Sequence, residues 1–134
     1  ATGTFTPTIL GTTTPGTPSY VTRRATYSVI GNVVHVYIYI QAAFSPNGTG
    51  SLVIDGMPGA IDPDPSYVDI GGAGVLNAVQ SGITTDDDGI LCYARSGQIE
   101  ILTNNSIGTP ESISASSIPA GIFEIAVTGM YIKA

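Results

Sequence analysis

The stretch IGNVVHVYIYI, residues 30–40, decides the fold expected for this chain. A tight turn at Gly31-Asn32 is followed by β-branched and aromatic residues in alternation, which is typical of a strand entered through a hairpin. Successive side chains of a strand point to opposite faces, so an aliphatic face is expected in the core and a face of polar-tipped rings outside it. The aliphatic face carries Val34, Val36, Ile38 and Ile40, and the other face carries Val33, His35, Tyr37 and Tyr39.

Similar short runs rich in Ile, Val, Thr and Tyr recur along all 134 residues, between 17 glycines and 9 prolines. Closely spaced strands with turn signals between them predict an all-β fold, and we expect an antiparallel, jelly-roll-like β-sandwich formed by residues 1–134 as a single domain. Helical signals are weak and limited to residues 73–79 and 112–117. The expected strands are residues 5–10 (an edge or first strand, because it contains Pro7), 22–30, 33–41, 50–54, 67–70, 89–95, 98–102 and 121–131.

The charge pattern excludes several classes of partner. Only 10% of residues are charged, four of them Lys or Arg, and the net charge is −6. Such a chain lacks the basic surface that nucleic acids and anionic membranes require. No segment approaches the roughly 20 apolar residues of a membrane-spanning helix, so membrane insertion is not expected.

Four sequence blocks resemble a known family. GTFTPTI at residues 3–9 is similar to a G-T-F/W-T-P-T opening, and ATYSVIGNVVHV at 25–36 to a G-x-Y-x-x-I/V-G-N/R-x-V-x-F/V block, with Ala25 in place of its glycine. IDGMP at 54–58 resembles I-x-G-L-P with Met57 in place of leucine, and AVTGMYI at 126–132 resembles a final strand ending in G-x-Y. In this order the blocks resemble the C-terminal β-sandwich domain of tailed-bacteriophage tail fibres and tailspikes, although residues 59–120 carry no matching block.

The resemblance implies a homotrimeric, extracellular domain at the distal end of a virion fibre or spike, cut from the C-terminal end of a longer protein. Such domains are associated with trimer stabilisation and with attachment to host-surface glycans. The implied partners are two further copies of the chain, the upstream part of the same fibre or spike, and a host-surface carbohydrate.

No catalytic constellation is specific enough to predict an enzyme. His35, the single histidine, could be combined with Ser28 and Asp69, but the chain has no G-x-S-x-G elbow. Paired carboxylates for glycoside hydrolysis are available, but no spacing singles out a pair. No metal or cofactor is expected, since the acidic run at residues 86–88 lacks the spacing of a calcium loop. Cys92, in an apolar run, is interpreted as a buried free thiol.

Two groups of residues are candidates for binding. Tyr67, Asp62 and Asp64 lie in the unmatched middle of the chain and could contact a ligand, with a surface loop stiffened by prolines as the alternative. The second group is expected at a subunit interface and comprises His35, Tyr37, Tyr39, Arg23 and Arg24. For His35 the alternative is a contact with a ligand. For the two arginines the alternative is simple exposure to solvent.

The sequence therefore favours a non-catalytic, trimer-forming domain that binds host carbohydrate. A purely structural cap that trimerises the fibre without touching a receptor is the alternative. A glycan-acting hydrolase is the third hypothesis.

Overall fold

The computed structural model describes residues 2–44, 48–58, 74–81, 90–95, 98–104, 110–118 and 121–133. These residues are almost entirely β-strands, and their one helix is the three-residue 3-10 turn η2 (Ala115–Ser117). The strands are β1 (Thr2–Phe5), β2 (Thr8–Gly11), β3 (Pro18–Ile30), β4 (Val33–Phe44), β5 (Leu52–Asp55), β6 (Gly74–Ser81), β7 (Ile90–Arg95), β8 (Gln98–Asn104), β9 (Pro110–Ser112) and β10 (Ile122–Ile132).

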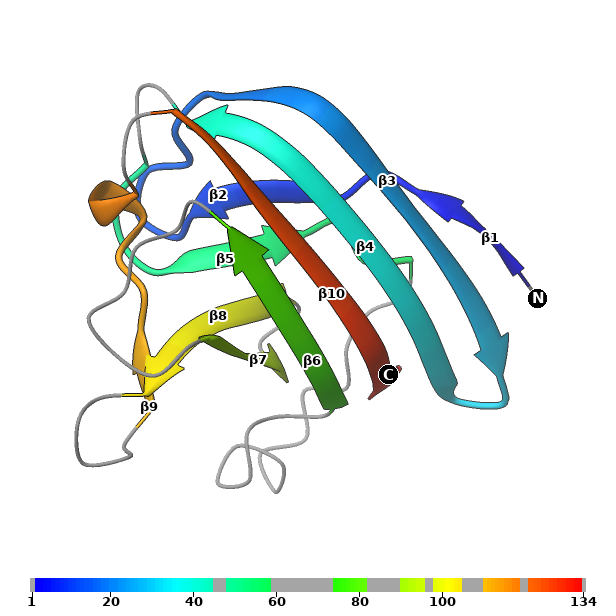
Figure 1. The fold of residues 1–134 in the computed structure, drawn as a ribbon. Helices are drawn as coiled ribbons and strands as arrows, with labels where there is room; N and C mark the ends of the chain where they lie inside the picture. The colour runs from blue at the N-terminus through cyan, green and yellow to red at the C-terminus, as the bar shows by residue number, and fades with distance from the viewer. Residues whose placement is uncertain are drawn as a thin grey trace.

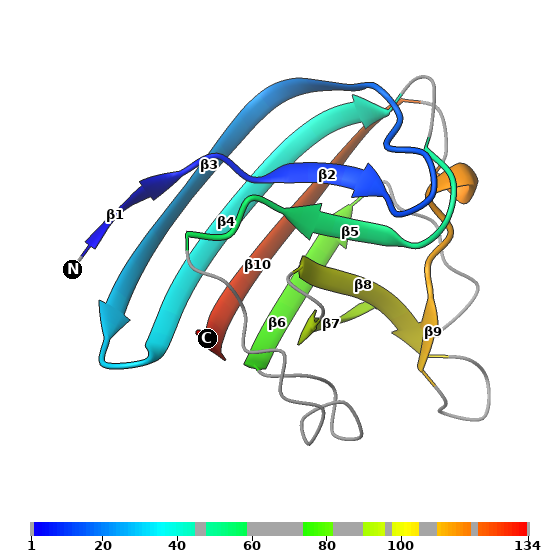
Figure 2. The same ribbon diagram turned by 180° about the vertical axis from the view of Figure 1, so that it is seen from behind.

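The strands form two antiparallel layers that pack face to face (Figure 1 and Figure 2). Their hydrogen-bonded order is β1-β3-β4-β10-β6-β7-β8-β5-β2, and β9 pairs with β8. The first layer contains β1, β3, β4, β10 and β6, and the strands of the second layer, β7, β8, β5 and β2, run across it. The two layers are joined where β6 pairs with β7 at Leu76 and Cys92. The antiparallel β-sandwich predicted from the sequence is confirmed.

The core depends on the alternation that the sequence shows in β4. This strand pairs with β3 along one side and with β10 along the other, so it lies inside the first layer. Its even-numbered side chains from Val34 to Phe44 are buried between the layers, and Ile38 and Ile40 have no exposed surface. Burying one such side chain contributes roughly 1.5–3 kcal/mol. The hairpin expected at Gly31-Asn32 is present, because Ile30 pairs with Val33 and Gly31 has a φ of 62°.

The start of the chain closes one corner of the sandwich. β1 and β2 are consecutive in sequence but occupy the two ends of the strand order, so the chain changes layers at Thr6 and Pro7. Proline suits this position, because it fixes φ and has no N–H to offer to a sheet. β3 supports the corner, since the Tyr20 hydroxyl accepts a hydrogen bond from the Ile9 amide at 3.0 Å. The Arg23 guanidinium donates to the Pro7 carbonyl at 3.4 Å and lies 3.9 Å from the centre of the Tyr20 ring.

Three details differ from the sequence-based expectation. Residues 5–10, predicted as one strand, are divided between β1 and β2 because of the break at Thr6 and Pro7. Residues 73–79 were the nearest approach to a helix, but β6 occupies residues 74–81 because it extends the first layer beside β10. The short helical signal at 112–117 becomes η2 after the unpredicted strand β9. The strand expected at 67–70 lies outside the described residues.

Replacing Ile38 by alanine is expected to lower the free energy of unfolding by about 2–5 kcal/mol, because the cavity forms in the middle of the core. Ile30→Ala is the matched control, since Ile30 is 70% exposed and Ile38 fully buried; it should cost less than about 1 kcal/mol. Urea denaturation followed by circular dichroism measures both. Equal losses would contradict the placement of β4 in the core.

Replacing Tyr20 by phenylalanine removes the acceptor of the Ile9 amide. The free energy of unfolding should fall by about 1 kcal/mol, the ordinary net value of a hydrogen bond that becomes unpaired. Tyr37→Phe, which removes a hydroxyl from an exposed ring, should have a smaller effect in the same denaturation experiment. An unchanged midpoint for Tyr20→Phe would show that the corner does not depend on this bond.

Candidate functional site

The surface of the first layer that points away from the second layer, called here the outer face, gathers most of the candidate residues. Cross-strand partners share a face of a sheet, and His35 on β4 lies between Ser28 on β3 and Met130 on β10. The same register extends over all five strands and produces rows of outward side chains. Three successive rows are Thr2, Ser28, His35 and Met130; then Thr4, Thr26, Tyr37 and Thr128; then Arg24, Tyr39, Ala126 and Val79.

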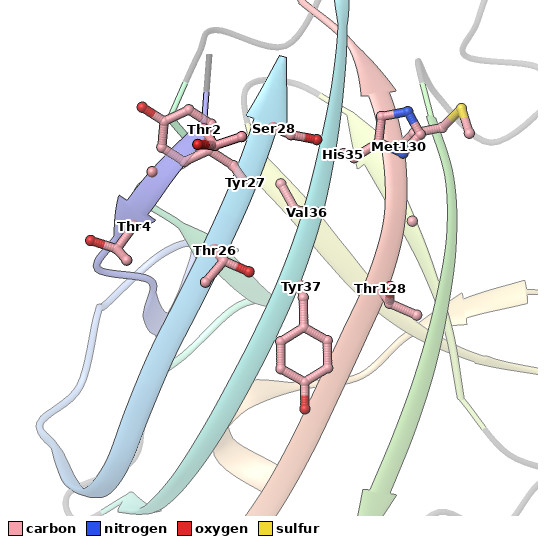
Figure 3. A pocket seen from close by; sticks show the side chains of 12 residues that line it. Thr2, Thr4, Thr26, Tyr27, Ser28, His35, Val36, Tyr37, Thr128 and Met130 are labelled. Carbon is pink, nitrogen blue, oxygen red and sulfur yellow. The ribbon is translucent and has the colours of Figure 1, made fainter. Parts of the chain in front are cut away.

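The first two rows line a hollow of about 640 Å³ on the outer face (Figure 3). Tyr37 lies between Thr26 and Thr128, which come from the strands on either side. None of the twelve lining residues is Asp, Glu, Lys or Arg. The lining consists of Thr2, Gly3, Thr4, Thr26, Tyr27, Ser28, His35, Val36, Tyr37, Thr128, Gly129 and Met130.

A smaller hollow of about 180 Å³ lies nearby, where β4, β10 and β6 carry Tyr39, Glu124 and Val79. The Tyr39 hydroxyl donates a hydrogen bond to Glu124 Oε1 at 3.0 Å. This bond favours the protonated phenol and raises the pKa of Tyr39, with partial desolvation and the charge of Glu124 acting in the same direction. The positive charge of Arg24 opposes the rise in this pKa.

The outer face also carries most of the large apolar side chains that are exposed to solvent. Val79 is 70% exposed and Ile122 57% exposed, and both lie on β6 or β10. Apolar side chains exposed on one face of a sheet are candidates for an interaction surface in soluble proteins. The described large apolar residues that are exposed are Val21, Ile30, Tyr37, Val79, Ile122 and Met130. Tyr37, Val79 and Met130 lie in the three rows, Ile30 and Ile122 pair with Val33 and Ala43 of β4, and Val21 lies at the β3 bulge.

The structure brings together four of the five residues expected at a subunit interface. His35, Tyr37, Tyr39 and Arg24 all lie on the outer face, and a contact between subunits through them stays a prediction. Arg23 faces the opposite side, as its adjacency to Arg24 implies, and contacts Pro7 and Tyr20 within the same chain. The proposed ligand-binding residues Tyr67, Asp62 and Asp64 lie outside the described residues.

The threonines of the hollow were missed in the sequence analysis. Thr2, Thr4, Thr26 and Thr128 come from three strands, and they become neighbours only through the pairing register. Their sole sequence signal is that each occupies an outward position of a strand. That signal could not separate them from ordinary sheet threonines.

Reactive chemistry has little support among the residues that the structure describes. Cys92 is buried, as predicted, and burial raises the pKa of its thiol to about 12. Ser28 and His35 are cross-strand neighbours, but no carboxylate lines their hollow and Asp69 lies outside the described residues. Within the described ranges, no three His, Cys, Asp or Glu side chains gather as a metal site, and no helix reaches the length and hydrophobicity of a membrane span.

Comparisons with known proteins add a likeness in fold. No protein-family model matches the chain, and no curated protein matches it. The crystal structure of the Dettilon tailspike protein (gp208) superposes with a TM-score of 0.70 over 100% of this chain, at 17% sequence identity. The chain spans 24% of the length of that protein. The fold is therefore similar to a part of a phage tailspike, in agreement with the resemblance found in the sequence.

Replacing Glu124 by alanine removes both the acceptor and the negative charge that favour the protonated Tyr39 phenol. The pKa of Tyr39 should fall toward its ordinary value of 10.0, so the phenolate forms at lower pH. Tyrosine ring carbon shifts followed by NMR from pH 8 upward measure this change. Glu100→Ala on β8 is the control and should leave the Tyr39 titration unchanged; an unchanged titration in Glu124→Ala would disprove the hydrogen bond.

Proposed function

We propose that this chain is a non-catalytic structural domain of a phage tail fibre or tailspike that self-associates as a homotrimer on the outside of the virion. The observation that carries the proposal is the likeness of its whole fold to part of the Dettilon tailspike protein. The four ordered sequence blocks between residues 3 and 132 support the same assignment, because they are a property of the sequence and not of the fold.

The proposed contact between subunits uses the apolar end of the outer face. We define the β10 patch as Tyr39, Val79, Ile122 and Ala126. Tyr39, Val79 and Ala126 line the smaller hollow together with Glu124, and Ile122 lies two residues before Glu124 on β10. Exposed Val79 and Ile122 would lose unfavourable contact with water on association. The Tyr39–Glu124 bond satisfies polar atoms at the edge of the patch, which limits the cost of burying them.

A cyclic trimer requires each subunit to present two different surfaces, because its contacts run head to tail. The β10 patch would meet a different part of the neighbouring chain. Arg24 lies in the same row as Tyr39 and Val79, so it can reach an acidic group of that neighbour. Arg23 is used within its own chain and is not assigned to this contact.

The non-catalytic part of the proposal rests on the lining of the large hollow. His35 and Ser28 lie side by side there, but the lining offers no carboxylate to orient the imidazole. A hydrolase would release reducing sugar ends from host polysaccharide. We expect no release above that of a heat-unfolded sample, and measurable release lost in Ser28→Ala would contradict the proposal.

The solution mass tests the trimer. We expect a species of about 41 kDa by sedimentation equilibrium, three times the 13.7 kDa of one chain. Val79→Asp should shift this mass toward the monomer, because the contact would then have to bury a second carboxylate near Glu124.

Val21→Asp is the matched control for Val79→Asp. Val21 is 60% exposed but lies at the β3 bulge outside the patch, so this variant should keep the trimer. A monomeric parent chain would contradict the trimer. Equal dissociation of the two variants would contradict the position of the patch.

A further inference from the structure

We infer that the β10 patch binds the β3–β4 hairpin end of a second copy of the chain, so that the contact between subunits runs head to tail. The inference rests on the proposed homotrimer and names the surface that the β10 patch meets. The hairpin end is defined here as Ile30, Val33, Ile132 and Lys133.

The hairpin end carries an apolar row that is open to solvent. Ile30 pairs with Val33 across the turn, and Val33 pairs with Ile132 of β10, so the three side chains lie side by side on the outer face. Ile30 is 70% exposed, and Val33 and Ile132 are partly exposed. Covering this row with another protein surface would remove its unfavourable contact with water.

The first layer carries a carboxylate near one end and a lysine at the other. Within its five strands Glu124 is the only Asp or Glu, and it lines the smaller hollow. Lys133 follows β10 directly, and its amide donates to the Asn32 carbonyl at 2.9 Å, which places it beside the hairpin turn. Because Glu124 and Lys133 are separated by about 30 Å of extended strand, they cannot pair within one chain.

These charges favour a contact between unlike ends over a contact between like ends. Two β10 patches facing each other would place Glu124 against Glu124, and two hairpin ends would place Lys133 against Lys133. Like charges across an interface are unfavourable, whereas a head-to-tail contact brings Lys133 close to Glu124 of the next copy. Arg24 lies on β3, on the other side of Tyr39 from β6, so the lysine can approach Glu124 from the β6 side.

The curvature of the first layer suits a closed ring. Each contact of a cyclic trimer turns the chain by one third of a full rotation, so the two contact surfaces of a subunit must face different directions. β3 has a bulge between Tyr20 and Thr22, and a bulge bends its strand. Figure 1 shows β3 curving over the top of the sandwich before it reaches the hairpin, so the end with the β10 patch and the hairpin end do not share one plane.

The first test mixes two variants that each lack one of the two surfaces. Val79→Asp disrupts the β10 patch and leaves the hairpin end intact, whereas Ile30→Asp disrupts the hairpin end and leaves the patch intact. In sedimentation equilibrium each variant alone should shift toward the monomer, with self-association about tenfold weaker than in the parent chain. An equimolar mixture should form a heterodimer of about 27 kDa, twice the 13.7 kDa of one chain, because one intact contact remains between the two variants.

NMR identifies the surfaces in that mixture even when the single contact is weak. Isotope-labelled Ile30→Asp should show shifted amide signals for residues 122–126 when unlabelled Val79→Asp is added, and unshifted signals when unlabelled Ile30→Asp is added. Val21→Asp remains the matched control, since Val21 is 60% exposed and lies outside both surfaces. This control should keep the mass of the parent chain.

Exchanging the two charges is the second test, and it does not depend on the apolar row. Glu124→Lys and Lys133→Glu should each weaken the trimer, because like charges then meet in every contact. The double variant restores opposite charges at each contact and should recover most of the lost association. Association no stronger in the double variant than in the single variants would contradict the pairing of Glu124 with Lys133.

The outcomes separate this inference from the proposed function. A monomeric parent chain overturns the trimer itself. A trimeric parent whose Ile30→Asp variant stays trimeric overturns the hairpin end alone and leaves the trimer. An Ile30→Asp variant that forms a dimer by itself, or a mixture that contains no heterodimer, overturns the head-to-tail contact.

Discussion

The two-residue period of β4 is the constraint on which the rest of the structure depends. β4 pairs on both sides along nearly its full length, so its neighbours β3 and β10 inherit its register. A shift by one residue would expose Ile38 and Ile40 and bury His35 and Tyr37, at a cost of several buried aliphatic side chains. The register is therefore fixed by the core, and the same register decides which side chains of β3, β4 and β10 lie on the outer face.

The N-terminal segment, residues 2–11, adds a second constraint, because its strands β1 and β2 belong to different layers. Its break at Thr6 and Pro7 places β1 beside β3 and β2 beside β5, so the two ends of the strand order are covalently joined. Two side chains of β3 form hydrogen bonds beside this break: the Tyr20 hydroxyl accepts from the Ile9 amide, and the Arg23 guanidinium donates to the Pro7 carbonyl. Because this arrangement pairs β1 with β3, Thr2, Gly3 and Thr4 of β1 line the large hollow. The shape of the hollow therefore depends on the correct folding of this corner.

The outer face divides into two regions of different chemistry. Near β1 the outward side chains are hydroxyls around Tyr37, whereas near β6 they include exposed Val79 and Ile122. Exposed apolar side chains occur in both regions, since Tyr37 and Met130 line the large hollow and Val79 lines the smaller one. The regions differ in charge, because the large hollow has no charged side chain whereas Glu124 lines the smaller one.

The sequence by itself determined the fold class, the buried face of residues 33–41 and the outward position of His35, Tyr37 and Tyr39, because alternation and turn chemistry are local properties of a short segment. It also indicated the tailspike-like fold. It could not determine the division of residues 5–10 between two layers, the strand at 74–81 or the gathering of Thr2, Thr4, Thr26 and Thr128. Those features depend on which strands pair and in what register, and only the burial of the whole core selects one pairing among the many that single strands allow.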